Sequence, residues 1–479
     1  MPGFWRDRQR PGKVFFRVRQ AGVSGEEEAP VQARTEPWFS RWGWLVLLSA
    51  AAAPALGLRA GLWHAPVVLE TAAFGVAVVA AAFILTWTAE AAEHDVSQAL
   101  ALAVLALIAV LPEYAVDITF AWKAGQEPHY AQYAAANMTG GNRLLVGLGW
   151  SMIVVIFWIR SRRTLLELAR SHQLELTFLG LATLYSFVLP FKASISLLDS
   201  LVLIGLFLIY LLLAARHPAE EPELMGPAKV IGSLPARRRR PVLVALFAFA
   251  AGIILVSAEP FAEGLVHTGI ELGIDEFLLV QWVAPLASEA PEFIAAGLMA
   301  WHMRAAAGMG ALISSKVNQW TLLVGGLPIA FAVSGRSLEP LPLDARQVEE
   351  VFLTAAQSLF AVAVLLGLAI SLAEGVVLAV LFITQAALPT QTIGDVLSWL
   401  WLDGLAAHLP AVVVEEPVRW AFAFLYLVCA AFVFWRQRRC FRQPWRAWFG
   451  EAVITETDLR AEAVSGRAGG SGPPPERRR

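Results

Sequence analysis

Long apolar runs recur along this chain and constrain its fold more than any other feature. A helix that crosses a bilayer needs about 20 mostly apolar residues, and stretches such as residues 99–110 (ALALAVLALIAV) contain no charge at all. Hydrophobic residues make up 57% of the 479 residues and charged residues 16%, whereas soluble domains average about 45–50% and about 25%. The chain is therefore predicted to be an all-α, polytopic membrane protein.

Twelve spanning helices are predicted from these runs. They cover residues 43–61, 65–89, 96–124, 131–159, 174–191, 196–215, 241–268, 276–301, 306–333, 350–371, 374–389 and 418–436. If the N-terminus is cytoplasmic, the segments that alternate to the cytoplasmic side hold 29 of the 37 Lys and Arg residues. Because cytoplasmic loops carry excess positive charge, we expect a multi-pass protein of the cell membrane with both termini in the cytoplasm.

Two stretches of the chain resemble each other. Pro112-Glu113 recurs as Pro291-Glu292 at an offset of 179 residues, and each pair is followed by a polar segment that ends in LLVG. Internal duplication is common in secondary transporters. The predicted copies span 65–215 and 241–389 with five helices each, and an odd number of helices places the two copies in opposite orientations.

The remaining segments flank these two repeats. They are a basic and acidic leader (1–42), an extra N-terminal helix (43–61), a cytoplasmic linker (216–240), an outer loop with a Trp-rich interfacial stretch (390–417), an extra C-terminal helix (418–436) and a basic tail (437–479). The leader lacks an early apolar core, so no cleavable signal peptide is expected. Two cysteines, Cys429 and Cys440, are too few for a disulfide framework.

The duplicated Pro-Glu pairs place ionisable groups at membrane depth, where they are costly and usually functional. Proline removes a backbone donor, and the two pairs predict broken helices with free carbonyl groups lining a cavity. Carboxylates together with carbonyl oxygens form the kind of site that holds hard cations.

With these motifs the chain resembles the sodium/calcium exchanger family of cation antiporters, over about residues 65–389. The resemblance implies two inverted five-helix repeats, here with one extra helix at each end. It implies secondary active antiport by alternating access, with a metal cation (calcium or a monovalent cation) moving against sodium or protons. It also implies inorganic cations and the lipid bilayer as partners, with no cofactor beyond the transported ions, no enzymatic activity and no nucleic-acid binding.

The resemblance carries over residue by residue. Glu113 and Glu292 match the two central glutamates of the family and are the predicted metal ligands. The other predicted ion-binding or transport residues are Asp117, Glu289, Ser288, Ser315, Gln319, Asn137 and Asn142. In the first copy, Gly141 and Leu145 replace the serine and the final ligand of the family pattern.

Two cations accompany the acidic residues. Arg143 and Lys316 fall inside predicted spans near equivalent positions of the two copies. Because lone buried charges are costly, one or both are predicted to neutralise part of the site. A fixed cation could replace one transported cation, and a buried lysine could release its proton when a metal ion enters.

Two other functions remain open at this point. The Glu113-x-x-x-Asp117 spacing also suits an intramembrane enzyme that uses paired carboxylates, although the sequence has no nucleophile motif or phosphate-binding loop. The departures from the family pattern are compatible with a membrane scaffold that has lost transport. Asp117 and Glu289 could also serve only as partners of the two cations, and the asparagines as contacts between helices.

Overall fold

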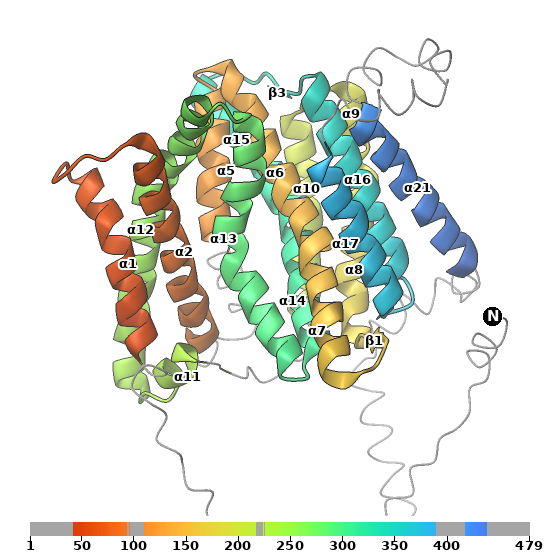
Figure 1. Ribbon diagram of the computed structural model, residues 1–479, viewed down its shortest axis with the longest axis horizontal. Coiled ribbons are helices and arrows are strands. Elements are labelled where there is room, and N and C mark those ends of the chain that lie inside the picture. Colours follow the sequence, from red (N-terminus) through yellow and green to blue (C-terminus); the bar gives the residue numbers. More distant parts are fainter. Residues whose placement is uncertain are drawn as a thin grey trace, which may run out of the picture.

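Most of the described chain in this computed structural model is helical, and the long helices run roughly side by side (Figure 1). The structure describes residues 42–92, 95, 110–216, 224, 226–388 and 417–437. Eight helical segments of this part of the chain are long and apolar enough to cross a membrane. Two shorter apolar helices, α1 (Trp44–Arg59) and α17 (Leu372–Ala387), accompany them.

The first half follows the predicted order of helices. It contains α2 (Val67–Ala92), α5 (Leu111–Ala124), η4 (Pro128–Tyr130), α6 (Ala131–Leu144), η5 (Leu145–Trp150), α7 (Ser151–Ser161), β1 (Leu165–Glu167), η6 (Arg170–His172), α8 (Gln173–Ser186), α9 (Val188–Lys192), β2 (Ser194–Ile195) and α10 (Leu197–Ala214). Residues 96–109 of the third predicted span lie outside the described residues.

The second half repeats this succession. It contains α11 (Pro227–Gly232), α12 (Ala236–Leu272), α13 (Glu276–Trp301), α14 (Ala305–Asn318), η7 (Gln319–Leu323), α15 (Val324–Gly335), β3 (Leu341–Pro342), α16 (Ala345–Leu365), β4 (Ala369–Ser371) and α17, and is followed by α21 (Pro417–Gln437). The leader, most of the outer loop and the tail lie outside the described residues.

Two short strand pairs join loops that are far apart in the sequence. β1 pairs antiparallel with β4, and β2 pairs antiparallel with β3. Alternation of the predicted helices places β1 and β4 on the cytoplasmic side and β2 and β3 on the outer side. Figure 1 shows β1 at the bottom of the helices and β3 at the top. Both pairings thus agree with the predicted alternation.

Two details differ from the sequence predictions. The predicted span 350–371 begins earlier and ends at Leu365, because Leu368 adopts a left-handed conformation (φ 52°) and the following residues form β4. Pro291 was expected to break its helix, but α13 continues through both Pro285 and Pro291. A proline removes only one backbone donor, and the packing around α13 keeps the rest of the helix intact.

The two halves share an irregularity at equivalent places. The π-helical segments η5 and η7 begin at Leu145 and Gln319, each directly after the polar helix that follows a Pro-Glu pair. A π-bulge inserts one extra residue per turn and often accompanies a functional site. Here the bulges lie at the ends of α6 and α14, which carry Asn137, Asn142, Arg143, Ser315 and Lys316.

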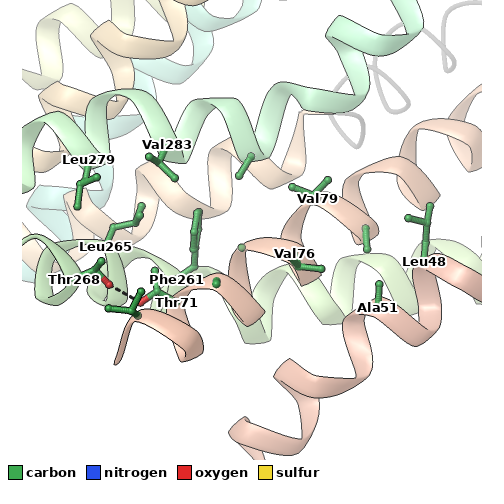
Figure 2. A pocket seen from close by; sticks show the side chains of 15 residues that line it. Leu48, Ala51, Thr71, Val76, Val79, Phe261, Leu265, Thr268, Leu279 and Val283 are labelled. Atoms are coloured by element: carbon green, nitrogen blue, oxygen red, sulfur yellow. Dashed lines mark hydrogen bonds between the residues drawn. The ribbon is translucent and has the colours of Figure 1, made fainter. Parts of the chain in front are cut away.

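Helices α1, α2 and α12 pack together at one side of the molecule (Figure 1). Between them and α13 lies a cavity of about 490 Å³ (Figure 2). Its lining is apolar except for Thr71 and Thr268, whose hydroxyl oxygens lie 3.1 Å apart. None of the predicted site carboxylates lines this cavity.

Ion pairs connect the C-terminal end of α2 to the N-terminal end of α12. Asp95, just after α2, accepts a hydrogen bond from Nε of Arg239 at 2.6 Å and one from Nε of Arg240 at 3.2 Å. These two guanidinium groups lower the pKa of the Asp95 carboxyl to about 2. The pair therefore stays ionised throughout the physiological pH range.

Candidate functional site

The first predicted carboxylates lie at the start of α5. Pro112 occupies one of the first positions of this helix, where a missing backbone N–H costs nothing. Glu113 follows in the first turn and is 5% exposed, and Asp117 lies one turn further with no exposed surface. The neighbouring Tyr114 donates its hydroxyl hydrogen to Oδ1 of Asn318 at 2.9 Å, which connects α5 to the second half of the chain.

The other two carboxylates lie on α13. Glu289 is buried, and its Oε1 accepts a hydrogen bond from Nε2 of Gln319 at 2.9 Å. Glu292 lies three residues later, and its Oε2 accepts a hydrogen bond from Oγ of Ser315 at 2.7 Å. Ser315 and Gln319 belong to α14 and η7. Both carboxylates of α13 are therefore hydrogen-bonded to residues of the same half of the chain.

The structure brings the four acidic residues together. The charge of Glu113 interacts with those of Glu289, Asp117 and Glu292, and its carboxyl group also lies beside the Gln319 side chain. Helices α5 and α13 pack against each other and against α6. Carboxylates from both halves of the chain therefore converge in one buried region.

Amide and hydroxyl groups complete this region. Asn137 lies beside the Asp117 carboxyl, although neither Asp117 oxygen accepts a hydrogen bond of ordinary geometry within the described part of the chain. Ser288 donates weakly to carbonyl oxygens of its own helix, at 3.2 Å from Ala284 and 3.3 Å from Pro285. Ser288 thus faces its own backbone rather than another site residue.

Gly141 explains one departure from the family pattern. A Cβ atom at this position would lie 2.5 Å from Oε1 of Glu289. The family pattern has a serine here, and any side chain would collide with the extra carboxylate of this chain. Gly141 and Glu289 are therefore complementary replacements on facing helices.

Lys316 is fully buried and directed at the other half of the chain. Its Nζ donates to the backbone oxygen of Asn142 at 2.7 Å and to Oδ1 of Asn142 at 2.9 Å. It also lies 5.0 Å from the centre of the Trp320 ring, and its charge interacts with those of Glu289 and Glu113. Asn142 therefore holds the lysine, while the carboxylates stand close enough to balance its charge.

Arg143 has a different partner from the one expected. Its guanidinium forms a buried ion pair with Glu350 on α16 and lies 5.0 Å from the Trp282 ring. Arg143 and Lys316 were predicted, singly or together, to neutralise part of the site, and the direct ionic partner of Arg143 is a fifth carboxylate, Glu350. Lys316 is the cation that stands next to the predicted site.

The carboxylates of this region do not form a preassembled metal centre. Among the described residues, no group of three or more His, Cys, Asp or Glu side chains is arranged to hold a metal ion. The oxygen donors present are carboxylate, amide and hydroxyl groups, which suit a hard cation such as Ca²⁺ rather than a softer metal. Glu113 and Glu292 remain the candidate ligands from the two halves, with the other oxygen donors around them.

Three charged residues of this region escaped the sequence prediction. Glu349 and Glu350 stand at the edge of a predicted span, and Arg419 stands at the start of the last one, so all three resembled ordinary interfacial charges. In the structure their exposed fractions are 1%, 0% and 8%. The signal that could have found them was Arg143, a cation at membrane depth that requires an acidic partner.

Comparisons with known proteins agree with this geometry. Residues 66–216 and 242–390 match the family described as sodium/calcium exchanger protein. The crystal structure of the H⁺/Ca²⁺ exchanger CAX is similar, with 44% sequence identity and a TM-score of 0.76, covering 84% of this chain and 96% of that one. The structure of native YfkE shares the fold at 17% identity and a TM-score of 0.54, covering 71% and 98% of the two chains. Among curated proteins, none matches the chain.

The two segments that match the family correspond to the two halves of the fold. Together they contain all four converging carboxylates. The family and the fold are those of membrane transporters for cations. This multi-pass membrane protein belongs to the sodium/calcium exchanger family.

Proposed function

We propose that this protein is a secondary active antiporter that exchanges a metal cation, with Ca²⁺ as the preferred substrate, for protons across the cell membrane. The observation that carries the proposal is the convergence of four carboxylates from two halves of the chain: the buried Glu113, Asp117 and Glu289, and the partly buried Glu292. The similar structure of an H⁺/Ca²⁺ exchanger supports the same choice of ions.

Charge balance is compatible with protons as the counter-ion. Among the described residues, Lys316 is the cation next to the four carboxylates, and its hydrogen bonds go to the neutral oxygens of Asn142. Ionised carboxylates without compensation are costly inside a membrane. Either a metal ion or protons can supply the missing positive charge, and exchange follows when the two alternate at the same carboxylates.

The repeat architecture supplies a route to alternating access. Two inverted repeats can exchange conformations, so that a site between them opens first to one side of the membrane and then to the other. Glu113 and Glu292 come from opposite repeats and would then approach the ion from opposite faces. We further propose that both termini lie in the cytoplasm, in agreement with the distribution of Lys and Arg.

Ion flux in proteoliposomes tests the proposal. Purified protein is reconstituted into vesicles with an acidic interior, and Ca²⁺ uptake is followed after the gradient is imposed, with parallel experiments that use Na⁺ or K⁺ gradients. We expect uptake driven by the proton gradient. Glu292→Gln should reduce it at least about tenfold, because a neutral amide can neither carry a proton nor balance a metal charge.

Glu339→Gln is the matched control, since this glutamate is exposed in the loop before β3 and should leave uptake unchanged. Exchange that requires Na⁺ and ignores the pH gradient would replace protons by sodium as the counter-ion. A folded protein that moves no cation under any gradient would support the scaffold alternative and end the transport proposal.

A further inference from the structure

The C-terminal helix α21 lies outside the residues that match the exchanger family, yet it packs closely on the transport domain. Its partner is α16, and aromatic rings join the two helices: Phe352 with Trp420 at 5.0 Å between ring centres, and Phe360 with Tyr426 at 6.1 Å. Figure 1 shows α21 at the edge of the helical bundle, beside α16. This helix thus has a defined docking face on α16.

Helix α21 inserts one charge into the interior. Nε of Arg419 lies 2.9 Å from Oε1 of Glu350, and its NH1 lies 3.8 Å from Oε2 of Glu349. Both glutamates are buried on α16. The second carboxylate oxygen of Glu350, Oε2, pairs with Arg143. Two arginines and two glutamates therefore form a buried, charge-balanced group (hereafter the α6–α16–α21 tetrad).

The tetrad is adjacent to the cation site through consecutive residues of α6. Arg143 follows Asn142, which provides both oxygen atoms that hold Lys316. The backbone oxygen of Arg143 also accepts a hydrogen bond from Nε2 of Gln357 on α16 at 3.5 Å. The charges of Arg143 and Lys316 interact with each other. A change in the tetrad can therefore reach Lys316 in two ways. It can move Asn142 through the α6 backbone, and it can change the electrostatic interaction between Arg143 and Lys316.

We propose that Arg419 is a positioning residue for cation transport: it balances the paired glutamates of α16, so that Arg143 and Asn142 stay in place and hold Lys316 beside the site carboxylates. Replacement of Arg419 would remove one positive charge from beside these two buried glutamates, next to α6. The extra helix is then a working part of the ion site rather than only a membrane anchor. This inference rests on the proposed function, but the experiment that tests it does not require transport.

The groups that face the tetrad define the expected response. Besides its own four members, Tyr426 on α21 interacts with Arg143, and Lys316 is the nearest cation of the site. Removal of one positive charge from this region leaves a more negative electrostatic potential next to α6. The site is therefore expected to bind a cation more tightly.

Ca²⁺ binding to purified full-length protein provides a readout that needs no transport. The dissociation constant is measured at fixed pH by isothermal titration calorimetry in detergent. We expect Arg419→Met to lower the dissociation constant at least about threefold, because one positive charge near the site is removed. Adding Glu349→Gln should restore the wild-type value, because the double variant has the same net charge as the wild type in this region, and Arg419→Lys should stay close to wild type.

Arg436→Met, the same substitution at an exposed position of the same helix, is the control and should leave the dissociation constant unchanged. If Arg419→Met does not fold, Glu349→Gln alone carries the test, because its surplus positive charge should raise the dissociation constant. An unchanged dissociation constant in folded Arg419→Met, or a shift that Glu349→Gln fails to reverse, would reduce α21 to a structural brace. Wild-type vesicles without cation flux would instead remove the proposed function and leave the binding result standing.

Discussion

At the scale of single residues, Lys316 is the side chain that most distinguishes this site. Its ammonium group is held by two neutral oxygens of Asn142 and stands within electrostatic reach of Glu289 and Glu113. Such an arrangement resembles a permanently bound monovalent cation more than a partner in a tight ion pair. It reduces the charge that the transported ions must supply.

Replacement of Lys316 by methionine tests this interpretation. The variant site is more negative by one charge, so each transport cycle should carry about one extra positive charge. The shift is read from the membrane potential at which Ca²⁺ flux reverses in proteoliposomes of fixed ion gradients. Lys229→Met, an exposed change on α11, is the control. An unaltered reversal potential in a transporting Lys316→Met protein would rule out the counter-charge role.

The sequence predicted the carboxylates better than it predicted their partners. Glu113 and Glu292 stand out because a Pro-Glu pair inside an apolar run is unusual and occurs twice. The contact between Lys316 and Asn142 and the pairing of Arg143 with Glu350 could not be predicted, because both join segments more than 170 residues apart. Such contacts depend on how helices rotate about their axes, which the hydrophobic pattern of nearly all-apolar helices does not fix.

At the scale of elements, the crossing of α6 and α13 determines whether the site can form. The two helices approach so closely that a Cβ atom at Gly140 would lie 1.8 Å from the backbone oxygen of Gln281. Small residues permit this kind of contact between membrane helices. Since α6 carries Asn142 and α13 carries Glu289 and Glu292, the distance between the helices sets the size of the ion site.

Gly140→Ala is therefore expected to be destabilising although the change is a single methyl group. The obstructing atom belongs to the backbone, so the helices must separate, at a cost of about 2 kcal/mol. The melting temperature of the purified protein in detergent measures the effect. Gly252→Ala serves as control, because a Cβ atom there meets nothing within 4 Å on α12. Equal melting temperatures for Gly140→Ala and wild type would contradict the close crossing.

The helical segments themselves were largely predictable from the apolar runs, but their irregularities were not. The expected break at Pro291 is absent, whereas π-helical segments occur at Leu145 and Gln319, where no proline marks them. A proline's effect depends on whether neighbouring helices can satisfy the freed carbonyl, and a bulge depends on side chains that must face a common site. Both are tertiary effects.

At the scale of the whole molecule, the strand pairs show which loops lie on the same side, and the charge distribution predicts which side is cytoplasmic. β1 and β4 belong to loops on the predicted cytoplasmic side, and β2 and β3 to loops on the outer side.

This orientation predicts which loops are accessible from outside the cell. After replacement of Cys429 and Cys440, a single cysteine is introduced at Arg163 or at Glu339, and intact cells are treated with a maleimide that does not cross membranes. We expect labelling of Glu339→Cys in intact cells, and of Arg163→Cys only after permeabilisation. The opposite pattern would invert the proposed topology.

The contact between Lys316 and Asn142 has a consequence for the ancestry of such a protein. The two residues occupy the same position of the repeated segment, and they meet where the halves face each other. In a dimer of two identical half-length chains, each residue at this place would meet its own copy. Two lysines would repel each other, and two asparagines would leave the carboxylates without a fixed cation. The contact therefore requires two halves whose sequences can differ at this position, and a single chain that contains both halves meets this requirement.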